Sequence, residues 1–149
     1  MDTIVINKNE DLSEILTHHN AGKMEMYLLQ KKPWDKLGKQ VNLSNRLMKE
    51  GLSVYIEVKF CSDFSKRPKR LEVVSLDKDY NLCIYKFSSS QKFDRDASEL
   101  EEILDEVKNK YKGQIKSIHG ILAVTSQDEY DYIKENILQY SKAVNVILL

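Results

Sequence analysis

The sequence predicts an α/β protein with one mixed sheet, built from an antiparallel meander and a parallel β-α-β unit and flanked by helices. Between Leu52 and Phe87, three strand-like segments follow one another with no helix-period segment between them, as in an antiparallel meander. Near the C-terminus, IHGILAVTS, a helical segment and AVNVILL have the order of a β-α-β unit, whose right-handed crossover places two strands parallel. The continuous apolar character of VNVILL is typical of a strand covered on both faces.

Residues 1–149 are expected to form one α/β domain, because 149 residues with 42% hydrophobic composition suffice for one buried core. The charge is balanced, with 23 basic and 23 acidic residues, so any nucleic acid must bind through a local patch. The apolar runs are strand-sized, and the N-terminus lacks the pattern of a signal peptide. We therefore expect a cytoplasmic protein without membrane contact.

Apolar periodicity predicts the individual elements. Strands are expected at residues 3–7, 24–30, 52–60, 71–77, 82–87, 118–125 and 143–149. The first of four helices follows Asn9 as its cap, and the second covers residues 35–50 with Gly51 as its stop. The capping-box pattern Ser-x-x-Glu opens the third helix at Ser98 and the fourth at Ser126.

The strand at residues 52–60 contains Glu57-Val58-Lys59, the E-x-K pattern that metal-dependent nucleases of the restriction-endonuclease type use in their active sites. Period-2 alternation places the apolar residues from Leu52 to Phe60 on one face and Glu57 with Lys59 on the other. Nuclease chemistry needs carboxylates from neighbouring strands that hold Mg²⁺ and a lysine that orients water. A solvent-facing strand gives the same alternation, so both interpretations stay open.

The order helix, three strands, helix, strand from Asp35 to Thr125 resembles the core of the PD-(D/E)XK nuclease superfamily. The closing GILAVTSQDEYDYI…VNVILL is similar to the last strand-helix-strand of Mrr-type restriction enzymes. The resemblance implies that Glu72 occupies the position of the family's metal-binding Asp and Lys86 that of its Lys. Ile84 stands where the family has its second acid.

Isoleucine cannot bind Mg²⁺, so the catalytic motif is incomplete in this register. A rearranged site that combines Glu57, Glu72 and Lys86 across the meander is the alternative, and Lys59 belongs to the E-x-K candidate. We expect no cofactor, or Mg²⁺ in the case of an active nuclease, and no appreciable Mg²⁺- or Mn²⁺-dependent cleavage.

The loop CSDFSKRPKR, residues 61–70, holds the dense cationic cluster of the chain. The residues expected to contact nucleic acid there are Phe64, Lys66, Arg67, Lys69 and Arg70, the cations through phosphates and the ring through a base. A solvated loop at the end of a sheet is the alternative. The acidic side chains between Asp94 and Glu106 balance this charge and are expected on a solvated helix.

The sequence lacks the motifs of metal sites built from histidine or cysteine and of nucleotide-binding loops. No HxxxH or HxxH pair exists, and Cys61 and Cys83 are far apart, so no metal site is expected. The glycines never form GxG or GxxxxGK, which argues against a nucleotide-binding loop. The prediction is a binding module for nucleic acid or protein, including a homodimer; the alternatives are a Mg²⁺-dependent nuclease and a subunit that pairs exposed strand edges such as 3–7.

Overall fold

The computed structural model describes residues 5–6, 11–18, 34–62, 67–89, 91–136 and 143–149. They contain one six-stranded sheet in the order β1 (Val5–Ile6), β2 (Ser53–Phe60), β3 (Lys69–Leu76), β4 (Asn81–Phe87), β5 (Ser117–Val124), β6 (Val144–Leu148). Strands β2, β3 and β4 form an antiparallel meander. Strand β1 pairs parallel with β2, and at the other end of the sheet β4, β5 and β6 run parallel to one another. The predicted mixed sheet is therefore confirmed. The strand expected at 24–30 lies outside the described residues.

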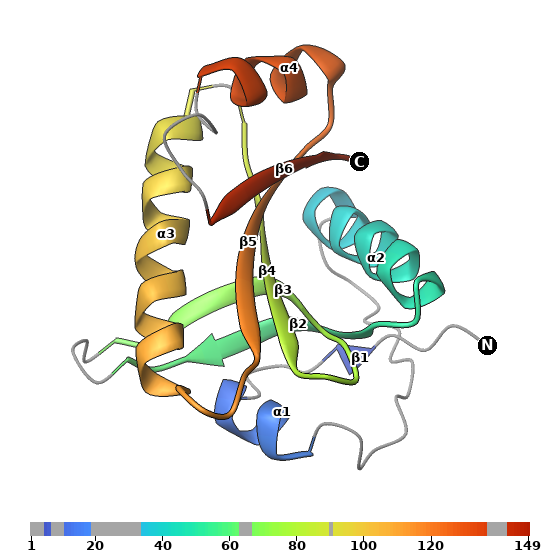
Figure 1. Ribbon diagram of the computed structural model, residues 1–149. Coiled ribbons are helices and arrows are strands. Elements are labelled where there is room, and N and C mark those ends of the chain that lie inside the picture. The colour runs from blue at the N-terminus through green and yellow to red at the C-terminus, as the bar shows by residue number, and fades with distance from the viewer. Residues whose placement is uncertain (1–4, 7–10, 19–33, 63–66, 90, 137–142) are drawn as a thin grey trace.

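Helices cover both faces of this sheet (Figure 1). They are α1 (Leu12–His18), α2 (Trp34–Lys49), α3 (Phe93–Lys110) and α4 (Gln127–Asn136). Helix α2 packs on β2 and β3 from one side, whereas α3 packs on β4, β5 and β6 from the other, together with α1 on β2. The larger apolar core lies between α3 and the sheet, and a smaller one lies under α2. None of the helices in the described residues is long and apolar enough to cross a membrane.

Two of the predicted helix ends are confirmed by their local chemistry. The backbone at Gly51 has a φ of 86°, a left-handed conformation that glycine adopts without steric cost, and α2 stops just before it. At the start of α4 the Glu129 N–H donates to Ser126 Oγ at 3.2 Å, and the Ser126 hydroxyl donates to the Glu129 carboxylate at 3.1 Å. The expected cap Asn9 lies outside the described residues, and Asp11 Oδ1 accepts the Ser13 N–H at the start of α1.

The predicted start of the third helix is wrong, because α3 begins at Phe93, five residues before Ser98. Phe93, Ala97 and Leu100 are all buried and lie at helical spacing, so the apolar stripe that packs on the sheet extends back beyond Ser98. Acidic residues in the first turn also suit the positive end of the helix dipole.

Helix α3 approaches β5 closely at Gly120. A Cβ atom at this position would lie 2.8 Å from Leu100 Cγ and 2.9 Å from both Leu100 Cδ2 and Leu104 Cδ1. The missing side chain of Gly120 thus sets the distance between helix and sheet, and with it the position of the α3 side chains that face β4.

Strand β2 turns over in its middle, at Glu57. Val54 and Ile56 pack with α2, whereas Val58 and Phe60 belong to the core under α1 and α3. The expectation that all apolar residues of this strand share one face is therefore wrong. The physical reason is the φ of 55° at Glu57, which breaks the two-residue period of an extended strand.

Strand β3 turns over at the same level. Leu71 packs in the core under α3, but Val73 packs with α2, and Val74 returns to the core under α3. Because Ile56 pairs with Val73 and Val58 with Leu71, Glu57 and Glu72 lie at the same level of the two strands. The two glutamates thus occupy the place where both strands exchange their faces.

Candidate functional site

Three of the four predicted catalytic residues lie at one level of the sheet. Val73 of β3 pairs with Ile56 on one side and with Tyr85 on the other. Glu72 is adjacent to Val73, and Glu57 and Lys86 are adjacent to its two partners. The fold therefore brings Glu57, Glu72 and Lys86 onto three neighbouring strands, although their roles stay predictions.

Glu57 is held by two donors and by a strained backbone. Its Oε1 accepts from Gln40 Nε2 at 3.0 Å, and its Oε2 forms an ion pair with Arg70 Nε at 2.9 Å. The buried Gln40 amide also donates to the Glu72 main-chain carbonyl at 3.0 Å. A left-handed backbone costs a residue such as glutamate about 1–2 kcal/mol. Strain of this kind concentrates at functional sites, which makes this level of the sheet a candidate.

Glu72, which lies beside Glu57 in the sheet, differs from it in the burial of its carboxylate. Its Oε2 is buried and has no hydrogen-bond partner among the described residues. Burial raises the pKa of Glu72 above its ordinary value, while the positive charges of Lys86 and Arg70 act in the opposite direction. An acid in such a place takes up a proton more readily than an exposed one.

A cavity of about 390 Å³ opens beside Glu72, and we call it the β4–α3 cavity. The charged side chains that line it come from four elements: Lys39 of α2, Glu72 of β3, Lys86 of β4, and Lys92, Arg95 and Asp96 at the start of α3. Lys92 makes no side-chain cap at the start of α3. The first N–H groups of a helix lack partners within it, so they add positive potential to this cavity.

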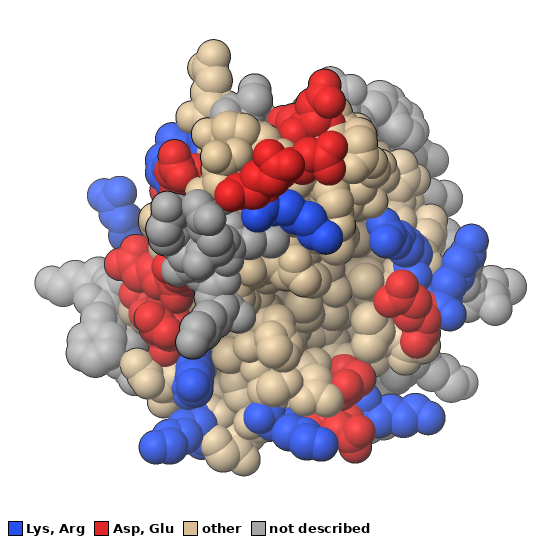
Figure 2. Space-filling model, turned by 45° about the horizontal axis from the view of Figure 1, so that its top comes forward, with Lys and Arg blue, Asp and Glu red and all other residues tan. Residues whose placement is uncertain are grey.

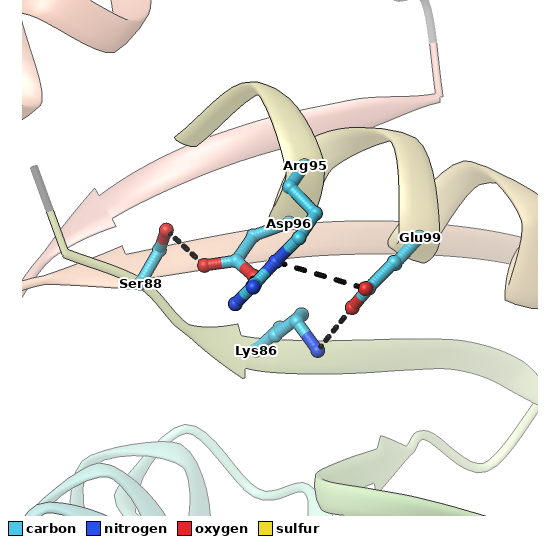
Figure 3. Close-up of polar contacts among 5 residues, drawn as sticks. All are labelled: Lys86, Ser88, Arg95, Asp96 and Glu99. Carbon is cyan, nitrogen blue, oxygen red and sulfur yellow. Dashed lines mark hydrogen bonds and ion pairs between the residues drawn. The ribbon is translucent and has the colours of Figure 1, made fainter. Parts of the chain in front are cut away.

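A polar network fixes the walls of the β4–α3 cavity (Figure 3). The Ser88 hydroxyl donates to Asp96 Oδ2 at 2.6 Å, and Asp96 is only 4% exposed. Lys86 Nζ lies 3.2 Å from Glu99 Oε2, and Arg95 Nε lies 3.8 Å from Glu99 Oε1. The network directs the Lys86 ammonium toward α3.

Sequence reasoning missed the part that α3 plays in this site. The acids of this helix were expected in solvent, which is wrong for Asp96. The signal was present, since Asp96 lies between Phe93 and Leu100 on the apolar stripe. This position of Asp96 on the stripe can be recognised only when the helix is taken to start at Phe93.

The hairpin between β2 and β3 forms a second cation-lined cavity of about 410 Å³, which we call the hairpin cavity. Its lining includes Lys59, Lys69 and Arg70 together with Glu57. Two of these cations have acidic partners, because Arg70 pairs with Glu57 and Lys69 Nζ lies 2.8 Å from Glu106 Oε2. Of the other predicted contacts, Arg67 is exposed, and Phe64 and Lys66 lie outside the described residues.

On the face that Figure 2 shows, charges of both signs are mixed, but acids gather over the end of the molecule where α4 lies. The sequence QDEYDYIKEN of α4 contains four acids and one lysine, which agrees with this view. Helix α4 is therefore a poor surface for a polyanion, and the two cavities are the better candidates.

The residues of this site do not fit a metal centre formed by protein ligands alone. No three His, Cys, Asp or Glu side chains of the described residues are placed to hold a metal ion. Ile84, at the position where the family resemblance implies an acid, is 1% exposed and belongs to the core under α3.

Comparison with known proteins gives little further information. No protein-family model matches the chain, and no curated protein is detectably similar to it. Among solved structures, a repair endonuclease from Pyrococcus abyssi is similar, with a TM-score of 0.43 and 13% sequence identity. The match covers 83% of this chain and 49% of the endonuclease chain, so the chain spans about half the length of that structure. This similarity is too low to assign a role to any residue.

Proposed function

We propose that this protein binds nucleic acid through the sugar-phosphate backbone, without cleaving it, by means of the β4–α3 cavity and the hairpin cavity. The observation that supports the proposal is the charge of their linings. Four Lys or Arg side chains line the first cavity and three line the second, against two acids and one acid respectively. On a chain with no net charge, this is a local concentration of cations, and phosphate groups are the ligands that such a concentration attracts.

Two segments that are distant in sequence supply the cations of the β4–α3 cavity. Lys39 comes from α2, whereas Lys86, Lys92 and Arg95 come from β4 and the start of α3, which follow each other in the chain. Convergence on one concave surface distinguishes this arrangement from scattered surface lysines. Contacts of this kind position a backbone but carry no base sequence, so binding is expected to be sequence-tolerant and strongly dependent on salt.

Fluorescence anisotropy with a labelled oligonucleotide in a salt series tests the proposal. The informative variant is Lys39→Ala with Lys92→Ala, because both side chains are exposed and their loss leaves the core intact. Two lost phosphate contacts are expected to weaken binding and to flatten the log K against log salt slope by about 1.8 on duplex DNA, or by about 1.4 on a single strand. The matched control is Lys78→Ala with Lys108→Ala, two exposed lysines that line neither cavity.

The two outcomes are distinct. A weaker and flatter salt response in the cavity variant, but not in the control, supports the site. Equal affinity and slope for the wild type and both variants would remove the β4–α3 cavity from the proposal, as would absence of binding by the wild type at low salt.

The hairpin needs its own variant. Replacement of Lys66, Arg67, Lys69 and Arg70 by alanine is expected to flatten the slope of log K against log salt. The expected change corresponds to the loss of up to roughly four phosphate contacts. An unchanged slope in this quadruple variant would remove the hairpin and leave the β4–α3 cavity as the binding surface.

A Mg²⁺-dependent nuclease is the second candidate, and the alignment of Glu57, Glu72 and Lys86 on neighbouring strands favours it. It is tested by incubating DNA and RNA with the protein and Mg²⁺ or Mn²⁺. Cutting that is lost in both Glu72→Gln and Lys86→Ala would replace the binding proposal with the nuclease. Cutting that is lost in Glu57→Gln and Lys59→Ala would place the reaction at the E-x-K pattern instead.

A further inference from the structure

We infer that Glu99 of α3 competes with phosphate for two cations of the β4–α3 cavity, so that this carboxylate limits the affinity of the protein for nucleic acid. The inference rests on the proposed function and concerns the control of the same site. It names the side chain that an incoming phosphate group displaces.

The carboxylate of Glu99 spans two cations, as Figure 3 shows. Its Oε2 lies 3.2 Å from Lys86 Nζ, and its Oε1 lies 3.8 Å from Arg95 Nε. Lys86 and Arg95 line the β4–α3 cavity, whereas Glu99 does not belong to the lining. The acid therefore engages two of the four cavity cations from beside the cavity.

The other two cations of the cavity lack such a partner. Lys39 and Lys92 form no ion pair with any acid in the part of the chain that the structure describes. The charge of the cavity is thus divided, because Glu99 offsets Lys86 and Arg95 and leaves Lys39 and Lys92 as they are.

The chemistry of the two ligands explains the competition. Carboxylate oxygens and phosphate oxygens are anionic acceptors for the same N–H donors of lysine and arginine. A phosphodiester that reaches Lys86 or Arg95 must replace the contact with Glu99 or share the cation with a second negative charge. Either case lowers the affinity relative to a cavity without this acid.

The contacts of Glu99 are weak enough to be exchanged. The side chains of Lys86, Glu99 and Arg95 are 24%, 47% and 60% exposed, and exposed ion pairs contribute little to stability. Asp96 also lies 3.7 Å from Arg95, but it is only 4% exposed and accepts from the Ser88 hydroxyl at 2.6 Å. Glu99 is therefore the acid that a ligand displaces, and Asp96 stays in place.

Fluorescence anisotropy with a tetramethylrhodamine-labelled oligothymidylate in a salt series tests the inference. Glu99→Gln keeps the size of the side chain and removes its charge. This variant is expected to bind up to about fivefold more tightly than the wild type at low salt, the factor that corresponds to one exposed ion pair. The slope of log K against log salt is expected to steepen by about 0.7 for each cation that gains a phosphate contact on the single strand.

Two further variants identify the cause of the gain. Glu102→Gln removes the same charge from an exposed position of α3 that lines neither cavity, and it is expected to bind like the wild type. Lys86→Met removes the ammonium group that Glu99 engages and keeps most of the apolar stem. In this background Glu99→Gln is expected to gain less affinity than it does in the wild type, because part of the competition is already absent.

Three results would overturn the inference. The first is unchanged or weaker binding by Glu99→Gln, since weaker binding would mean that Glu99 positions Lys86 for the ligand. The second is an equal gain in Glu102→Gln, and the third is the same gain of Glu99→Gln with and without Lys86, because both would reduce the effect to net charge. Urea unfolding verifies that each variant is folded.

Failure of the inference is distinguishable from failure of the proposed function. If Lys39→Ala with Lys92→Ala weakens binding while Glu99→Gln changes nothing, the proposed function stands and only the competition fails. Absence of binding by both the wild type and Glu99→Gln at low salt would remove the proposed function and the inference together.

Discussion

The close packing of α3 on β5 predicts that Gly120→Ala destabilises the protein. The new Cβ would lie 2.8–2.9 Å from carbon atoms of Leu100 and Leu104, whereas favourable carbon contacts lie at roughly 3.5–4.0 Å. Leu100 and Leu104 are 0% and 2% exposed, so neither side chain moves aside into solvent. Overpacking of this kind costs about 1–3 kcal/mol of the free energy of unfolding.

Urea unfolding of a double-mutant cycle measures the effect. Leu100→Ala alone is expected to cost about 2–5 kcal/mol, because it leaves a cavity in the core under α3. In the double variant the methyl group added at position 120 enters the space that Leu100 vacates, while its contact with Leu104 Cδ1 at 2.9 Å stays. The double variant is therefore expected to be more stable than the sum of the single changes implies, by part of the cost of Gly120→Ala.

The control is Gly38→Ala in α2, where an added Cβ meets nothing within 4 Å. This change is expected to stabilise the protein by about 0.5–1 kcal/mol, the ordinary gain for alanine over glycine in a helix. If Gly120→Ala proved as stable as the wild type, or if the two changes in the cycle were additive, the proposed contact between α3 and β5 would be wrong.

Two further changes test the local chemistry. Ser126→Ala removes the cap of α4 and is expected to lower the free energy of unfolding by about 1 kcal/mol in urea unfolding, whereas an unchanged midpoint would contradict the capping box. Burial raises the pKa of the Cys83 thiol from 9.0 to about 11. The unfolded chain therefore loses this proton first, and stability is expected to fall between pH 9 and 11 by about 1.4 kcal/mol per unit. In Cys83→Ala this part of the pH dependence should disappear, and an unaltered curve would count against thiol burial as its cause.

The sequence by itself determined the element order and most of the pairing. The antiparallel meander and the parallel β-α-β unit follow from contiguous residues, because apolar periodicity and connection length are local properties. The stop at Gly51 and the cap at Ser126 are equally local, since each depends on atoms within one turn of chain.

Only the tertiary structure decided which face each part of a strand presents. Glu57 has a left-handed backbone because the two halves of β2 pack against different helices, and period-2 alternation contains no information about that choice. The same packing fixed the start of α3, where burial of Phe93 outweighed a capping pattern at Ser98.

The composition of the candidate site was also decided only by the tertiary structure. Glu72 and Lys86 were predicted from the sequence through the order of elements, but other side chains that line the cavity beside them come from α2 and α3. Lys39 and Asp96 line the cavity only because the sheet and its two flanking helices bring three segments together, at residues 39, 72 and 86–96. Residues so far apart carry no common local pattern, and long-range packing alone places them together.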